Sequence, residues 1–171
     1  VVGKVIDVLL TGWRLELNSP YTAVLPLKEA TSEFVARGAD LTQFFRLNDY
    51  VLTKITNVTS QKLVDVSMKG PGLRKLHQGR LIEVNPHKVP RIIGKEGSMV
   101  ALVKNATGCA ISVGQNGWVW ISGEAEKEYT AVKAIKLIEV EAHKEGLTER
   151  VKTFLEKETG QKIEAITRPV Q

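Results

Sequence analysis

The sequence is poor in the residue types that build disulfide frameworks, metal centres and membrane spans. It has one cysteine among 171 residues, so no internal disulfide can form, and its three histidines are scattered along the chain instead of placed at zinc-ligand spacing. No apolar run approaches the roughly 20 residues that a bilayer-spanning helix needs, and no signal peptide is visible. We therefore expect a cytoplasmic protein with no membrane partner, metal or cofactor. Its cysteine, Cys109, lies in an apolar stretch and is predicted to be a small buried residue.

Acidic residues are scattered along the chain instead of clustered. A metal-dependent nuclease needs grouped carboxylates that can hold two ions. Here the acids occur singly or as helix-surface pairs such as Glu139 and Glu141. The pattern therefore predicts no catalytic residue, and a nuclease is the weakest of the alternatives.

Positive charge is concentrated in one part of the sequence. The whole chain has a net charge of +5, whereas residues 69–95 carry seven lysines and arginines against one acid, Glu83. A local basic zone of this kind indicates a polyanionic partner more strongly than a basic average does. The alternative interpretation is a solvated linker that happens to be rich in lysine.

The first 69 residues contain short β-rich runs separated by turn residues. These runs are 1–10, 13–17, 21–27, 50–58 and 63–67. Five such runs predict a five-stranded β-barrel of the OB fold, with an insertion at 29–48 in which 32–35 and 42–45 form single helical turns. Trp13 alternates in phase with Leu15 and Leu17, which predicts a core position, while Arg14 lies on the opposite face.

The second half begins after the turn-rich connector Lys69-Gly70-Pro71-Gly72 and predicts an α+β domain. The expected elements are a strand at 79–84, a helix at 88–93, a helix from Ser98 to Gly108, strands at 109–113 and 118–122, a helix from Ser122 to Gly146, a helix from Thr148 to Gly160 and a strand at 162–167. Ser98 and Thr148 are expected to cap their helices. The apolar face expected for the long helix consists of Tyr129, Val132, Ile135, Ile138 and Ala142. Asn116-Gly117 between two β runs is a strong hairpin signal.

The loop Gly94-Lys95-Glu96-Gly97 joins two of these predicted helices. Glycines without a Cβ let a phosphodiester backbone approach the main chain, and the free N–H groups of the following helix favour phosphate. Strand, helix, GxxG loop, helix, strand, strand and helix is an order that resembles the type I KH family, whose loop clamps about four nucleotides of single-stranded nucleic acid. The alternative is an unrelated α+β domain with a chance pair of glycines.

Three segments of the first half resemble the S1 family of OB-fold RNA-binding domains. They are Val2-Gly3-Lys4-Val5, Gly12-Trp13-Arg14-Leu15-Glu16-Leu17 and Asn48-Asp49-Tyr50-Val51. We therefore expect an S1 domain at 1–69, a type I KH domain at 70–146 and a C-terminal helical extension at 147–171.

One S1 domain followed by one KH domain resembles the RNA-binding cap subunit of the archaeal exosome. Trp13 with the following Leu-Glu-Leu-Asn-Ser residues fits this family, and Gly114-Gln115-Asn116-Gly117 resembles the glycine-X-asparagine-glycine signature of exosome KH domains. The resemblance implies a non-catalytic subunit in a trimeric cap, alone or mixed with the other cap protein. That cap would guide single-stranded RNA to the pore of a hexameric RNase PH-like ring that degrades it from the 3′ end. The family also has an N-terminal β domain, and this chain begins inside a predicted strand, so we expect a piece of a longer protein.

The candidate RNA contacts form two groups, and the Gly114, Asn116 and Gly117 turn is expected to be structural. Those of the KH loop are Arg91, Ile93, Gly94, Lys95, Gly97 and Lys104. Those of the S1 domain, expected on the pore side, are Arg14, Tyr21, Lys28, Arg37 and Arg46. Lys95 can pair with phosphate, whereas Glu96 has the wrong sign and is expected to point to solvent or pair with Lys95. The alternative function is a structural adaptor in an RNA-processing or transcription complex with little RNA affinity.

Overall fold

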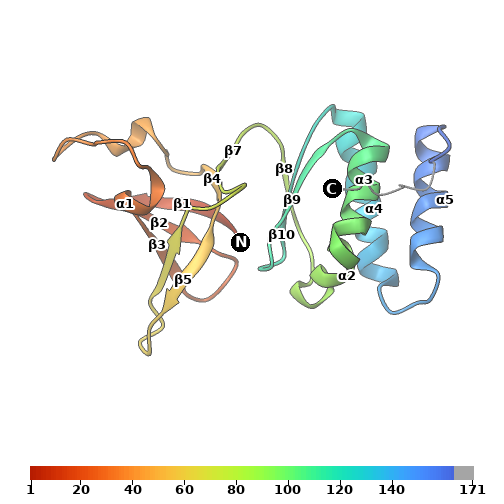
Figure 1. Cartoon of the computed structure of the whole chain (residues 1–171), viewed down its shortest axis with the longest axis horizontal. Coiled ribbons are helices and arrows are strands. Elements are labelled where there is room, and N and C mark those ends of the chain that lie inside the picture. Colours follow the sequence, from red (N-terminus) through yellow and green to blue (C-terminus); the bar gives the residue numbers. More distant parts are fainter. Residues whose placement is uncertain (164–171) are drawn as a thin grey trace. The chain divides into compact units, whose positions relative to one another are not determined.

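A computed structural model of the chain describes residues 1–163 (Figure 1). Contacts within the chain divide it into two units. The first unit comprises residues 1–78 together with 114–118, and the second comprises 79–113 together with the chain from 119 onwards. The division falls at 78/79, slightly beyond the boundary expected at 69/70, and the helix after residue 146 belongs to the second unit.

The first unit is built on one curled β-sheet. Its strands are β1 (Val2–Val8), β2 (Gly12–Glu16), β3 (Thr22–Pro26), β4 (Tyr50–Leu52), β5 (Lys54–Val58), β6 (Val64–Ser67) and β7 (Lys75–Leu76). The order across the sheet is β5-β6-β3-β2-β1-β4-β7, with β3 and β6 parallel. Only Thr53 separates β4 from β5, so the strand paired with β1 continues directly into the strand paired with β6, and the sheet curls round.

Trp13 forms the centre of the core of this unit, as its alternation with Leu15 predicted. Its side chain is completely buried, and its indole Nε1–H donates to the carbonyl oxygen of Phe45 at 3.1 Å. The Trp13 ring also meets the Phe45 ring edge-on, with the ring centroids 4.8 Å apart. Such aromatic pairs stabilise a core beyond the area they bury. Arg14, the next residue, is exposed on the outer face of β2.

The insertion between β3 and β4 holds little regular structure. It contains α1 (Leu27–Ala30) and the 3₁₀ turn η1 (Leu41–Gln43), which lies close to the turn predicted at 42–45. The helical turn predicted at 32–35 is wrong, because the chain there is irregular. A single turn fixes several dihedral angles for one hydrogen bond, and the Phe34 side chain, 95% exposed, gains no burial that would offset that cost.

The second unit follows the element order predicted from the sequence. It contains β8 (Arg80–Glu83), η2 (Pro86–Lys88), α2 (Val89–Ile93), η3 (Lys95–Gly97), α3 (Ser98–Thr107), β9 (Ala110–Val113), β10 (Trp118–Ser122), α4 (Ala125–Glu141) and α5 (Leu147–Thr159). The three strands form a sheet in the order β8-β10-β9. In Figure 1, α5 lies on the outer side of α3 and α4, away from this sheet.

One apolar core joins the sheet and all four α-helices of this unit. Ile92, Ile135, Val151 and Leu155 are completely buried within it, and Cys109 is buried as predicted. The predicted packing face of α4 is partly wrong. Tyr129 is 55% exposed, because Ala131 and Ala134 are buried in its place, one turn ahead of the buried Ile135 and Ile138.

Two helices of this unit, α3 and α5, were expected to have a serine or threonine as the N-terminal cap. In the structure the cap residue of each is a glycine. Gly97 precedes α3 and Gly146 precedes α5, both with left-handed backbone angles, and no side chain caps either helix. Ser98 and Thr148 lie in the first turns instead. The long helix predicted to open at Ser122 begins later, at Ala125 after Glu124.

The ends of these helices agree better with the sequence. Gly108 and Gly160 follow the last residues of α3 and α5 as predicted, whereas α4 ends at Glu141, before Gly146. The predicted strand at 162–167 lies, from residue 164 on, outside the described residues. Among residues 1–163, no helix combines the length and apolar character that crossing a membrane requires.

Candidate nucleic-acid interface

The GxxG loop has backbone angles that favour glycine at both of its ends. Gly94 has φ 76° and Gly97 has φ 77°, and between them Glu96 is also left-handed at φ 54°. A Cβ on Gly94 would lie 2.6 Å from the backbone nitrogen of Met99, whereas a Cβ on Gly97 would meet nothing within 4 Å. Gly94 therefore lets the loop pass close to the start of α3, and Gly97 leaves an open surface at the point where α3 begins.

A cavity of about 540 Å³ lies beside this loop, and we call it the loop cavity. Its walls come from α2, the loop, the start of α3 and the start of α5. The lining residues are Pro90, Arg91, Gly94, Lys95, Ser98, Met99 and residues 146–149. The structure therefore brings together three of the six residues predicted for the KH loop: Arg91, Gly94 and Lys95.

Arg91 and Lys95 contribute positive charge to the loop cavity in different ways. The Arg91 Nε–H donates to the carbonyl oxygen of Ala142 at 2.9 Å, which ties its side chain to the end of α4. Lys95 is exposed, and its ammonium group forms no ion pair with any residue in the range 1–163. One cation is therefore held in position by the fold, and the other is available to an incoming anion.

The other predicted loop residues lie outside the lining of this cavity. Ile93 is half-buried and packs against the core of the second unit. Gly97 occupies the turn just before α3. Lys104 is exposed in the last turn of α3. Its carbonyl oxygen accepts the backbone N–H of Gly108 at 2.7 Å.

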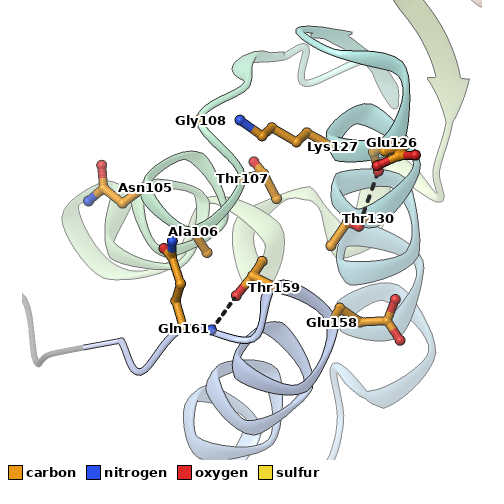
Figure 2. A pocket seen from close by; sticks show the side chains of 10 residues that line it. All are labelled: Asn105, Ala106, Thr107, Gly108, Glu126, Lys127, Thr130, Glu158, Thr159 and Gln161. Atoms are coloured by element: carbon orange, nitrogen blue, oxygen red, sulfur yellow. Dashed lines mark hydrogen bonds between the residues drawn. The ribbon is translucent and has the colours of Figure 1, made fainter.

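Helices α3 and α5 give the second unit an electrostatic polarity. Their N-terminal ends both line the loop cavity, and their C-terminal ends both line a second cavity of about 410 Å³, shown in Figure 2. Helix N-termini favour anions and C-termini favour cations. The second cavity also carries the carboxylates of Glu126 and Glu158, together with the Lys127 side chain and the start of α4. It thus has two carboxylates for one cation, whereas the loop cavity has two cations, Arg91 and Lys95, for one carboxylate, Glu149, so a phosphate fits the loop cavity better.

The residues predicted as RNA contacts in the first unit are not brought together. In the pairing of β2 with β3, Gly12 lies opposite Pro26 and Glu16 lies opposite Thr22. Tyr21 and Lys28 consequently flank opposite ends of β3. Arg14 lies between these ends on β2, Arg37 lies in the irregular part of the insertion, and Arg46 follows η1.

Lys62 is a cation of this unit that the sequence interpretation missed. Its ammonium nitrogen lies 2.8 Å from the hydroxyl oxygen of Tyr21 and 5.0 Å from the centroid of the Tyr21 ring. The contact depends on the parallel pairing of β3 with β6, which no local pattern reveals. An exposed aromatic ring beside a cation is the combination with which OB folds stack bases and hold phosphates.

Asp49 fixes the chain ahead of β4. Its carboxylate accepts the Arg46 backbone N–H at 2.7 Å and pairs with the Lys75 ammonium at 3.0 Å. Burial raises the pKa of Asp49, but these two interactions outweigh that effect and hold the pKa below its ordinary value. Arg46 is thus close to a carboxylate, which reduces the positive charge that it presents to a polyanion.

The turn predicted to be structural belongs to the first unit. Gly117 has φ 86°, and a Cβ on Gly114 would lie 2.8 Å from the backbone nitrogen of Val2. The amide side chain of Asn116 donates hydrogen bonds to the backbone carbonyl oxygens of Val2 and Leu17.

Within residues 1–163, no group of three histidine, cysteine or acidic side chains could hold a metal ion.

A curled β-sheet unit and a unit with a GxxG loop between two helices define a protein of two-domain S1–KH architecture. A family model described as KH domain matches residues 79–127, which include this loop. A crystal structure described as an exosome complex RNA-binding protein superimposes with a TM-score of 0.80 at 32% identity, covering 92% of this chain and 91% of that one.

Several relatives carry the name exosome complex component Rrp4. Exosome complex component Rrp4 of Methanothermobacter thermautotrophicus is 43% identical over 94% of this chain, which spans 50% of that protein. The Rrp4 proteins of Picrophilus torridus and Thermoplasma acidophilum are 42% and 41% identical, and this chain covers 69% and 68% of their lengths. The chain belongs to the Rrp4 family of exosome complex components.

Proposed function

We propose that this chain is the RNA-binding part of a non-catalytic cap subunit of the exosome, a 3′-to-5′ RNA-degrading complex. Three such subunits, alone or with the other cap protein, would sit on a hexameric RNase PH-like ring in the cytoplasm and deliver single-stranded RNA to its pore. The names of the relatives, exosome complex component and exosome complex RNA-binding protein, support this assembly. The chain spans half of the length of the first of these relatives.

The observation that carries the RNA-binding part of this proposal is the GxxG loop with its cavity. Gly94 keeps the loop against the start of α3, Gly97 leaves open space, and Lys95 and Arg91 supply positive charge. A phosphodiester backbone can therefore approach main-chain N–H groups with two cations beside it. The proposed loop contacts are Arg91, Ile93, Gly94, Lys95, Gly97 and Lys104.

The first unit would add a second, mainly electrostatic contact. We take β4 and β5 as one bent strand, which gives the five-stranded OB barrel of an S1 domain over residues 1–69, followed by the KH domain at 70–146 and the helical extension at 147–171. Arg14, Tyr21, Lys28, Arg37 and Arg46 remain the proposed contacts, joined by Lys62. A ring of basic groups in a trimeric cap raises the local concentration of the RNA strand near the pore.

The loop is tested by placing a negative charge where the phosphate is expected. In Gly97→Asp the new side chain has open space, so the fold survives with the modest strain of a left-handed φ of 77°. Gly108→Asp is a matched control, because Gly108 has φ 68°, equally open space and a position at the other end of α3. We expect the affinity for single-stranded RNA, measured by fluorescence anisotropy, to fall about tenfold or more in Gly97→Asp only.

The alternative function, a structural adaptor with little RNA affinity, is favoured by Glu96, an exposed carboxylate in the loop itself. Equal RNA affinities for Gly97→Asp, Gly108→Asp and the unmodified protein would support the adaptor. The assembly is tested separately by co-purification: the full-length protein should bring down RNase PH-like subunits, and their absence would contradict the cap role.

A further inference from the structure

Helix α5 lies outside the part of the chain that matches the KH family, yet it forms one wall of the loop cavity. The family match ends at residue 127, whereas Gly146, Leu147, Thr148 and Glu149 line the cavity opposite the GxxG loop. The position of α5 is fixed, because Leu147, Val151 and Leu155 are buried in the same core as α2 and α3. Any ligand that fills the cavity therefore contacts both the loop and α5.

The two walls of the loop cavity differ in chemistry. The loop wall carries the cations Arg91 and Lys95, which suit a phosphate. The α5 wall carries the hydroxyl of Thr148 and the carboxylate of Glu149, and a carboxylate repels phosphate but accepts hydrogen bonds. Within residues 1–163 the Glu149 carboxylate has no ion-pair partner. The best ligand thus has an anionic group at one end and hydrogen-bond donors at the other.

A single nucleotide has this distribution of groups. Its phosphate is anionic, and its base carries donors on the edge that is open in a single strand. The volume of about 540 Å³ lies within the range of pockets that hold small ligands, roughly 300–1,000 Å³. Among the four bases, guanine alone offers two adjacent donors, N1–H and N2–H, which one carboxylate can accept together as it accepts the fork of an arginine.

We infer that the loop cavity is a nucleotide subsite of the RNA path and that Glu149 selects guanine there. The phosphate of this nucleotide faces Lys95 and Arg91, and the base faces α5. This inference rests on the proposed RNA binding by the GxxG loop. It assigns to α5 a specificity-determining role that the match of residues 79–127 to a KH domain does not include.

The test uses an octamer of adenines and a set of octamers in which each adenine in turn is replaced by guanine. Their affinities are measured by fluorescence anisotropy for the unmodified protein, Glu149→Gln and Glu145→Gln. Glutamine keeps the shape of the side chain but accepts with one atom only, so it cannot pair with both guanine donors. Glu145 is exposed, lies four residues earlier and does not line the cavity, so its variant controls for the loss of one negative charge.

We expect one guanine position to improve binding by about tenfold, the low end of the discrimination that a bidentate contact to a base provides. This preference should disappear in Glu149→Gln and persist in Glu145→Gln. A preference that survives Glu149→Gln, or no preference at any position, overturns the inference. Gly97→Asp is measured with the same octamers, so that failure of the subsite can be told from failure of RNA binding by the loop. If the inference is overturned but Gly97→Asp weakens the binding of every octamer, the proposed function stands without the subsite. If Gly97→Asp weakens the binding of none, the proposed function fails as well.

Discussion

The side-chain amide of Asn116 donates to the carbonyl oxygen of Leu17 at 2.9 Å, across 99 positions of sequence. The same nitrogen, Nδ2, donates to the carbonyl oxygen of Val2 at 2.7 Å, and Oδ1 accepts the Val2 backbone N–H at 3.4 Å. The carbonyl oxygen of Asn116 in turn accepts from the Asn18 side chain at 3.0 Å. One residue of the 114–118 turn thus supplies partners to the start of β1 and the end of β2 within the first unit.

Asn116→Ala should destabilise the first unit by about 2 kcal/mol, because three partly buried hydrogen bonds to the backbone lose their partner. The measurement is the urea dependence of unfolding, with amide hydrogen exchange at Val2 as a local readout. Gln115→Ala is the control, since Gln115 is exposed in the same turn. If both variants are equally stable, the contacts of Asn116 contribute nothing to the fold.

Asp49→Asn should cost about 1 kcal/mol at neutral pH, because the variant loses the charge that pairs with Lys75 and strengthens the bond to Arg46. The native pKa of Asp49 lies below that of the unfolded chain, about 3.9 for an unperturbed aspartate. The contribution is therefore complete above that value and is lost as the pH falls through the native pKa. Unfolding free energies of both proteins at pH 7 and at progressively lower pH give the difference directly. A difference that grows on acidification would contradict the assigned direction.

Local patterns predicted most elements of the second unit and the buried Trp13, because alternation, helical spacing and glycine stops each act over a few residues. Gly108 and Gly160 end their helices as their position in the sequence indicated. The residues that cap the starts of α3 and α5 were predicted wrongly, because more than one neighbouring residue can take the cap position. Ser98 and Thr148 have the chemistry of caps, but the preceding glycines occupy the cap position with left-handed angles. A rule based on residue type alone cannot separate these two arrangements.

The candidate site could be predicted only where its residues are neighbours in sequence. Arg91, Gly94 and Lys95 are near one another on the chain and line one cavity. Glu149 joins them because α5 packs against α3, and Lys62 meets Tyr21 because β6 pairs with β3. Both contacts arise from tertiary packing, for which a single sequence carries no local signal.

Leu155→Ala should destabilise the second unit by about 3 kcal/mol, the cost of a large-to-small change at a completely buried leucine. The reason is that α5 shares the core of this unit instead of forming a separate appendage. Lys157→Ala, an exposed position two residues further on, should change the stability by less than about 0.5 kcal/mol. Thermal or urea unfolding measures both. If removing the Leu155 side chain has no more effect than removing that of Lys157, α5 is not part of the folded core.

Lys95→Ala should weaken the binding of single-stranded RNA and also reduce its dependence on salt. Each phosphate contact made by a cation contributes about 0.7 to the slope of log K against log salt for a single strand. Lys95 is exposed and forms no ion pair in residues 1–163, so we expect the magnitude of the slope to fall by about that amount. Lys157→Ala removes an equal charge near the other end of α5 and should leave the slope unchanged. Equal slopes for Lys95→Ala and the unmodified protein would show that the phosphates pass elsewhere, even if the affinity itself had fallen.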